Sequence, residues 1–145
     1  MTTMAAILKR KPTALISVPP EARIREVVVV LAEKRIGAVV VQSPNSDLLG
    51  ILSERDVVRS LAANGTATLE MEASQLMTRA PTTATPSTTV FEAENLMTDG
   101  RFRHLPIVDG GKLVGVVSIG DVVKSLIETQ THEVRSLREY VNGSA

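Results

Sequence analysis

The chain has 145 residues, with 16 basic residues balanced by 16 acidic ones and no cysteine. Its length is typical of one domain, and its scattered basic residues exclude the concentrated positive charge of a nucleic-acid-binding or polybasic membrane-binding protein. The lack of cysteine excludes disulfides and thiolate metal ligands, and no apolar run approaches the roughly 18 residues of a membrane span. We therefore expect a soluble, cytoplasmic protein that binds neither nucleic acid nor membranes.

The first half of the chain predicts a helical turn, a strand, a helix, a strand hairpin and a further helix. Pro19 and Pro20 end the first strand, because proline cannot donate to a sheet ladder. Apolar residues at helical spacing, among them Ile24, Val27 and Leu31, indicate the first long helix. The expected elements are a helical turn at 4–8, strands at 15–18, 38–42 and 48–52, and helices at 21–36 and 53–63.

The second half predicts the same order, after a connection at 66–77 whose apolar spacing suits a short helix. Its last helix begins at 118, runs towards Tyr140 and carries a thin apolar stripe on an otherwise charged surface. The stripe consists of Val123, Ile127, Val134, Leu137 and Val141. The other expected elements are strands at 82–85, 105–108 and 113–117 and a helix at 87–99.

The two halves also match residue by residue. The stretch Gly50-Ile-Leu-Ser-Glu-Arg-Asp56 returns as Gly115-Val-Val-Ser-Ile-Gly-Asp121, and further back the valines at 39–41 align with Leu-Pro-Ile at 105–107. A match sustained through several apolar runs and a glycine indicates a structural repeat. Because each repeat is small for an independent core, we expect the two halves to share one core.

The duplicated Ser-x-x-Asp, at Ser53 and Asp56 and again at Ser118 and Asp121, stands where a strand gives way to a helix. One interpretation is a helix capping box, with serine at the cap and an acid three residues later. The other is a ligand site, because N–H groups at a helix start attract phosphate and a carboxylate can accept the hydroxyls of a ribose. The two roles are compatible.

These features resemble a tandem pair of cystathionine-β-synthase-type domains, called CBS domains, and in particular the small bacterial proteins that consist of one such pair. The resemblance rests on the duplicated Gly-apolar-apolar-Ser-x-x-Asp and on Leu-Pro-Ile-Val-Asp at 105–109. It implies an α/β fold in which two pseudo-twofold-related β-α-β-β-α repeats form one module with a C-terminal helical extension. The expected boundaries are 8–65 for the first repeat, 66–76 for the connecting segment, 77–128 for the second repeat and 129–145 for the tail.

The resemblance also implies clefts that hold adenosine-containing ligands, with AMP foremost and ADP, ATP, NAD or S-adenosylmethionine as alternatives. In this family the serine and aspartate of the motif contact the ligand, and segments of the opposite repeat complete each cleft. The first cleft would contain Ser53, Arg55, Asp56, Thr83, Phe102, Arg103 and His104. The second would contain Ser118, Asp121, Ile16, Ser17, Ile36, Gly37 and Ala38.

At the position just before the aspartate of the motif, the first repeat has Arg55 and the second has Gly120. With Arg103 borrowed from the opposite repeat, the first cleft would hold the cations that grip phosphate. We therefore expect the two clefts to be unequal, with the phosphorylated ligand in the first.

No catalytic group is evident, and with His104 and His132 as the only histidines no metal site can be assembled from close spacing. The expected function is a non-catalytic regulatory module that passes its signal to an unidentified regulated protein or through a change of assembly. The alternative is a ligand-free scaffold for dimerisation or protein interaction. We also expect a homodimer, because the family commonly pairs two modules and the C-terminal stripe offers further apolar surface.

Overall fold

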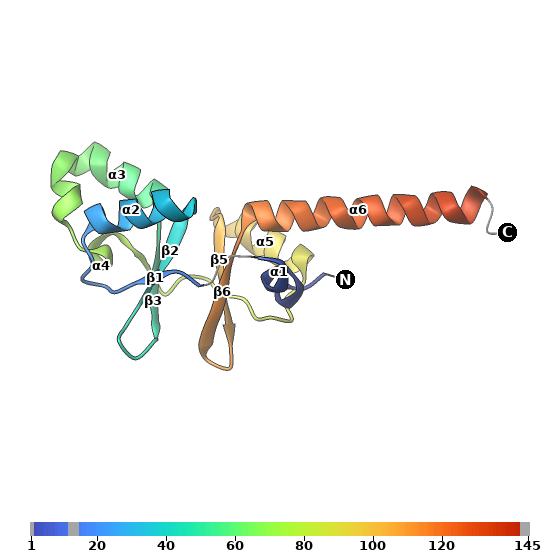
Figure 1. Cartoon of the computed structure of the whole chain (residues 1–145), viewed down its shortest axis with the longest axis horizontal. Coiled ribbons are helices and arrows are strands. Elements are labelled where there is room, and N and C mark those ends of the chain that lie inside the picture. Colours follow the sequence, from blue (N-terminus) through green and yellow to red (C-terminus); the bar gives the residue numbers. More distant parts are fainter. Residues whose placement is uncertain (1, 12–14, 143–145) are drawn as a thin grey trace. The chain divides into compact units, whose positions relative to one another are not determined.

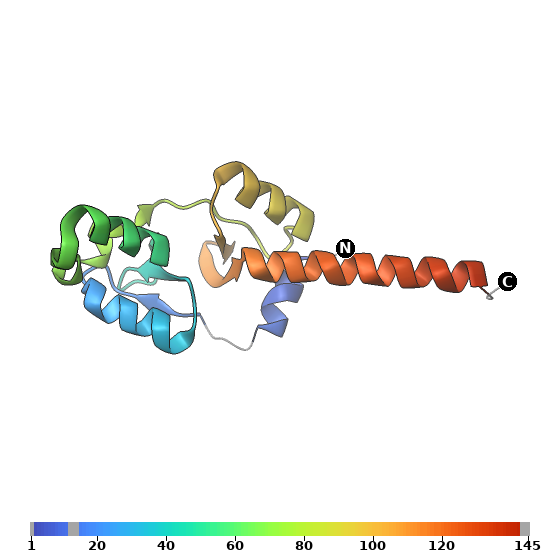
Figure 2. The same cartoon turned by 90° about the horizontal axis from the view of Figure 1, so that it is seen from above.

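The computed structural model describes residues 2–11 and 15–142, so part of the expected first repeat (12–14) and the end of the expected tail (143–145) lie outside the described residues. The confirmed α/β fold has its elements in this order: α1 (Met4–Arg10), β1 (Ser17–Val18), α2 (Ile24–Lys34), β2 (Ala38–Gln42), β3 (Leu48–Ser53), α3 (Glu54–Asn64), the 3-10 helix η1 (Gly65–Glu70), α4 (Ala73–Leu76), β4 (Thr78–Arg79), α5 (Val90–Gly100), β5 (His104–Asp109), β6 (Lys112–Ser118) and α6 (Ile119–Asn142) (Figures 1 and 2).

The chain divides into two compact units, each of which combines segments that lie far apart in the sequence. One unit contains Thr13–Thr82 with Val108–Val114, and the other contains Met1–Pro12, Thr83–Ile107 and Gly115–Ala145. The segment that carries α1 therefore belongs with the second repeat, although it precedes the first in the chain.

The first repeat contains a four-stranded sheet in the order β1-β2-β3-β4. β1 pairs with β2 in parallel, while β2 with β3 and β3 with β4 are antiparallel. β2 is buried from Ala38 to Val41, which explains why its sequence is apolar throughout rather than alternating. The short strand β4 was not expected from the sequence.

The second repeat is built on the two-stranded sheet β5-β6. The prediction of a strand at 82–85 was wrong, because this segment makes only an isolated parallel bridge between Ala84 and Ile107. The chain then turns: the N–H of Thr88 donates to the carbonyl of Thr85, and the N–H of Thr85 donates to the hydroxyl of Thr88. This turn uses the backbone groups that a longer strand would have needed.

The run of four valines in α2 is helical, as the sequence comparison with the second repeat predicts. Its buried face consists of Ile24, Val27 and Leu31. Burial of this face outweighs the weak helix propensity of β-branched residues. α2 and α5 also end alike, since Arg35 and Arg101 both adopt the left-handed conformation with φ of 53° and 56°.

Each repeat is completed by the short helix that precedes the other repeat in the chain. In the first repeat the N–H of Ile24 donates to the carbonyl of Met71, which leads into α4. In the second the N–H of Val90 donates to the carbonyl of Thr2, which leads into α1. The buried residues Ala73 of α4 and Met4 of α1 extend the two cores.

The expectation of a single shared core was wrong, because the buried residues form two clusters, one in each unit. The first cluster consists of Val18, Ala22, Ile24, Val27, Leu31, Val39, Val41, Leu52, Val57 and Ala73. The second consists of Met4, Ile7, Ala84, Val90, Ala93, Met97, Leu105, Ile107, Val117 and Val122. The exchanged short helices supply the extra apolar surface that a repeat of this size would otherwise lack.

Among residues 2–11 and 15–142, no helix combines the length and apolar character needed to cross a membrane.

Candidate functional site

The first Ser-x-x-Asp lies where β3 ends and α3 begins. The backbone N–H of Ser53 donates to Oδ2 of Asp56 at 2.8 Å, and the hydroxyl of Ser53 donates to the same oxygen at 2.9 Å. The N–H of Asp56 donates back to Oγ of Ser53 at 3.3 Å, which completes a capping box. The capping interpretation of this motif is thereby confirmed, and Oδ1 of Asp56 takes no part in the box.

The second Ser-x-x-Asp has the same geometry where β6 gives way to α6. The N–H of Ser118 donates to Oδ2 of Asp121 at 2.9 Å, and the N–H of Asp121 donates to Oγ of Ser118 at 3.2 Å. Both carboxylates are half-buried at a helix start, where the helix dipole favours negative charge. The duplication is therefore one of structure as well as of sequence.

Lys11 makes the two motifs different. Its Nζ lies 2.9 Å from Oδ2 of Asp121 and donates to the carbonyl of Val116 at 2.7 Å. Burial alone would raise the pKa of Asp121, but the backbone hydrogen bond from Ser118 and the positive charge of Lys11 outweigh it, so the pKa lies below its ordinary value. The second motif thus contains a cation that comparison of the two motifs by sequence did not reveal.

Lys11 was missed because it lies in the segment after α1, far from Asp121 in the sequence. A signal was present: the basic run Lys9-Arg10-Lys11 has no counterpart before the second repeat, where the aligned residues are Gln75-Leu76-Met77. Only the pairing of α1 with the second repeat shows which carboxylate this charge meets.

The segments before the middle strands lie beside the motif of their own repeat. The N–H of Glu54 donates to the carbonyl of Gly37 at 2.9 Å, and Ala38 pairs with Ser53 across β2 and β3. In the second repeat the N–H of Ile119 donates to the carbonyl of Arg103 at 2.8 Å. The pairing of each motif with the opposite repeat joins residues of different units and stays a prediction.

No described contact brings the remaining predicted residues together, and their roles as a ligand wall or as phosphate contacts stay predictions. Ile16 and Ile36 are half-buried against the first core cluster, and Phe102 is half-buried against the second. Ser17 is exposed at the start of β1, and Thr83 lines an open hollow beside α5. Arg55 and Arg103 are exposed and His104 is half-buried.

The described residues contain no group of three His, Asp or Glu side chains that could hold a metal ion. What the two motifs offer is a hydroxyl, a helix start and a carboxylate within one turn. This set suits a ligand that carries an anionic phosphate and a pair of hydroxyl groups.

A family model for the CBS domain matches residues 7–63 and 73–128, and the chain therefore belongs to the CBS-domain family as a pair of repeats. It is 35% identical over 117 residues to the mitochondrial CBS domain-containing protein CBSX3 of Arabidopsis thaliana, which covers 78% of this chain and 57% of that protein.

Solved structures of this family are similar in fold. The CBS-domain containing protein ATU1752 of Agrobacterium tumefaciens is 39% identical, with a TM-score of 0.82 over 85% of this chain and 92% of that one. The CBS domain protein PAE2072 of Pyrobaculum aerophilum, solved as a complex with AMP, is 30% identical, with a TM-score of 0.73 over 82% of this chain and 88% of that one. The fold expected from the sequence is thereby confirmed.

Proposed function

We propose that this chain is a regulatory module that binds adenosine-containing nucleotides through its two Ser-x-x-Asp motifs and does not alter them chemically. The observation that carries the proposal is the same half-buried serine and aspartate at the start of α3 and of α6. The AMP complex of the P. aerophilum relative supports an adenosine nucleotide as the ligand class.

In this proposal each motif divides the work between its two side chains. The serine hydroxyl at the positively polarised helix start contacts the phosphate, which at Ser53 replaces its hydrogen bond to Asp56, while the aspartate accepts hydroxyl groups of the ribose. The hydrogen bonds that the carboxylate accepts within the motif all fall on Oδ2 of the aspartate, so ribose binding through Oδ1 does not require the capping box to open.

The two motifs differ in how accessible the carboxylate is to a ribose. Asp121 is held by Lys11, whereas the contacts of Asp56 come from Ser53. A ribose at the second motif must share Asp121 with the lysine or displace it. The first motif is therefore the stronger site, and the exposed Arg55 beside it supplies charge for a phosphate.

Signalling follows from differential affinity, because a ligand that binds one arrangement of the protein better shifts the population towards it. Asp121 lies in the first turn of α6, and Lys11 lies just after α1. Displacement of Lys11 by ligand would therefore loosen α1 from α6 within the same unit. A regulated protein partner or a second copy of this chain could read that change.

The alternative is a scaffold that binds no ligand, in which the two motifs act only as helix caps. Native mass spectrometry of freshly purified protein, followed by titration with AMP, ADP, ATP, NAD and S-adenosylmethionine, separates the two. A co-purifying or titratable nucleotide is expected. Absence of binding to all five would favour the scaffold.

A further inference from the structure

The C-terminal part of α6 is a helix without a neighbour in the described chain. Val122 and Ser125 near its start are buried, whereas every residue from Gln130 to Val141 is exposed. Figure 1 shows this part extending past α1 and α5 of the same unit. An isolated helix of about 12–15 residues is marginal in water, so its apolar residues need a partner.

The exposed apolar residues of α6 follow a heptad repeat. Starting at Val123, the positions alternate by four and by three residues, which is the spacing of a coiled-coil seam. The a positions are Ile127, Val134 and Val141, and the d positions are Val123, Gln130 and Leu137. The exposed fractions of Val134, Leu137 and Val141 are 48%, 64% and 76%.

The residue types along this seam favour two parallel strands. All three a positions carry β-branched side chains and Leu137 is at d, a combination that favours parallel dimers. The single polar seam residue, Gln130, would meet its own counterpart across the dimer axis and fix the register by an amide hydrogen bond.

The charges that flank the seam select the same orientation. Glu133 is at a g position and Arg138 is at the following e position. In a parallel, in-register pair the g residue of one helix faces this e residue of the other, so Glu133 and Arg138 would pair twice. An antiparallel pair would instead bring e positions together, among them the basic Lys124 and Arg138. Neither Glu133 nor Arg138 forms an ion pair within the described residues.

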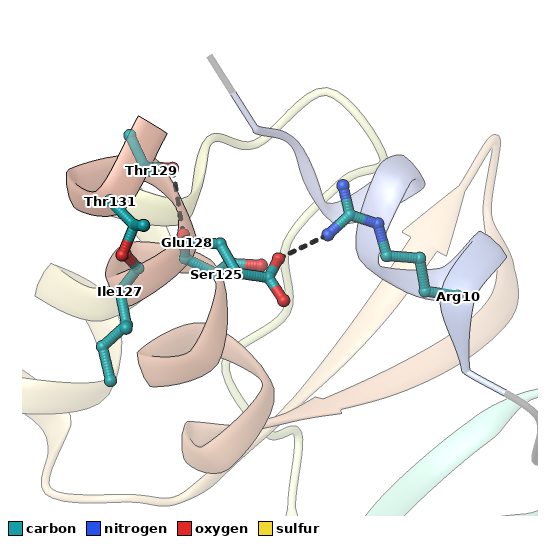
Figure 3. A network of polar contacts seen from close by, with 6 residues as sticks. All are labelled: Arg10, Ser125, Ile127, Glu128, Thr129 and Thr131. Atoms are coloured by element: carbon teal, nitrogen blue, oxygen red, sulfur yellow. Dashed lines mark hydrogen bonds and ion pairs between the residues drawn. The ribbon is translucent and has the colours of Figure 1, made fainter. Parts of the chain in front are cut away.

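The contacts that α6 makes inside the chain leave the seam open. Arg10 of α1 forms an ion pair with Glu128 at 2.8 Å, and Glu128 is at a b position outside the seam. Figure 3 shows Glu128 directed towards Arg10 and Ile127 directed away from it. The hydroxyls of Thr129 and Thr131 donate to carbonyls of α6 itself, so they do not hold the helix against another element.

We infer that the exposed part of α6 forms a parallel, in-register, two-stranded coiled coil with α6 of a second copy of this chain. The narrow stripe and the mixed acidic and basic residues around it do not suit a lipid surface, which favours a broad apolar face and a basic one. The inference does not depend on nucleotide binding.

Because the chain contains no cysteine, single cysteines report the geometry directly. Leu137→Cys places a thiol in the seam, and Ser136→Cys places one at the neighbouring c position on the outside. A disulfide requires Cα atoms within about 7 Å, which a parallel pair in register provides at position 137. We expect mild oxidation to cross-link Leu137→Cys into covalent dimers and to leave Ser136→Cys largely uncross-linked. Equal cross-linking of the two variants, or none at 137, would overturn the inference.

Sedimentation of charge variants provides an independent test. Glu133→Arg and Arg138→Glu should each raise the dissociation constant of the dimer by about threefold or more, and the double exchange should restore it. Leu137→Asp should raise it at least about tenfold, because it buries a charge in the seam. A monomeric wild type, an unchanged dimer in Leu137→Asp, or a double exchange that restores nothing would each contradict the coiled coil.

Discussion

The Nζ of Lys11 lies 2.9 Å from Oδ2 of Asp121, so the second motif pairs its carboxylate with a cation from the segment that follows α1. The corresponding carboxylate of the first motif, Asp56, accepts the hydroxyl of Ser53 instead. Two nearly identical sequence motifs therefore present different carboxylates to a ligand. The difference has measurable consequences for affinity and for stability.

Replacing Lys11 with methionine should strengthen the binding of adenosine at the second motif by about threefold to tenfold. Lys11 then no longer neutralises the carboxylate that accepts the ribose hydroxyls, and a hydrogen bond to a charged group contributes about 1.5–3 kcal/mol. Calorimetry with adenosine measures the change. Lys9→Met, at an exposed position of α1, is the matched control. Weaker binding in Lys11→Met would show that the lysine holds the ligand rather than the carboxylate.

The same ion pair predicts how stability depends on pH. The pKa of Asp121 is below its ordinary value of about 3.9, so its contribution is fully present above that value and is lost as pH falls through the lowered pKa. The melting temperature of the wild type should exceed that of Lys11→Met at about pH 5, and the gap should narrow towards about pH 3. A gap that does not change with pH would mean that Lys11 stabilises the fold without acting on Asp121.

The glycines that open the two motifs should tolerate a methyl group unequally. A Cβ on Gly50 would lie 2.6 Å from the backbone oxygen of Thr78, whereas one on Gly115 would lie 2.6 Å from Cδ2 of the flexible Leu8. Gly50→Ala should therefore cost about 1–3 kcal/mol in the free energy of unfolding, and Gly115→Ala less.

Gly120→Ala is the control for this pair, because its nearest neighbour is at 3.6 Å and it lies in a helix. It should be neutral or stabilising by up to about 1 kcal/mol. Thermal denaturation of the three variants gives the order of their stabilities. Equal losses of stability at Gly50 and Gly115 would contradict this prediction. They would mean that the Leu8 side chain beside Gly115 is as rigid as the Thr78 backbone beside Gly50.

Much of the fold could be predicted from the sequence, because a segment that is ambiguous in one repeat has a clearer counterpart in the other. The valine run in α2 is ambiguous alone, but its counterpart at 90–97 contains no β-branched run and establishes a helix. The capping boxes were predictable for a similar reason, since Ser53 and Ser118 precede an acid at the right spacing. These predictions rested on local sequence patterns that occur in both repeats.

The features that could not be predicted depend on contacts between distant segments. Nothing in the pattern around α1 shows that it completes the second repeat, so neither the separate cores nor the Lys11 contact with Asp121 followed from the sequence. The absent strand at 82–85 is a local failure, in which side-chain and backbone hydrogen bonds of Thr85 and Thr88 replaced the ladder.

The proposed phosphate contact at the first motif, with Arg103 borrowed from the opposite repeat, predicts a specific loss in arginine variants. Arg55→Ala and Arg103→Ala should each lower the affinity for AMP at least about threefold. The affinity for adenosine should stay nearly unchanged, because arginine contributes through the phosphate oxygens. Arg59→Ala, an exposed arginine further along α3, is the control. Equal losses for AMP and adenosine would assign the two arginines to the structure of the site rather than to the phosphate.

The central claim is that the motif aspartates hold a nucleotide, and calorimetric titration of AMP into Asp56→Ala and Asp121→Ala tests it most directly. Loss of a charged hydrogen bond of about 1.5–3 kcal/mol should weaken the affected site at least tenfold, with the larger effect on total affinity from Asp56. 2′-Deoxy-AMP should bind the wild type less well than AMP does. If both variants bind AMP as the wild type does and only melt at lower temperature, the aspartates are helix caps and the claim is contradicted.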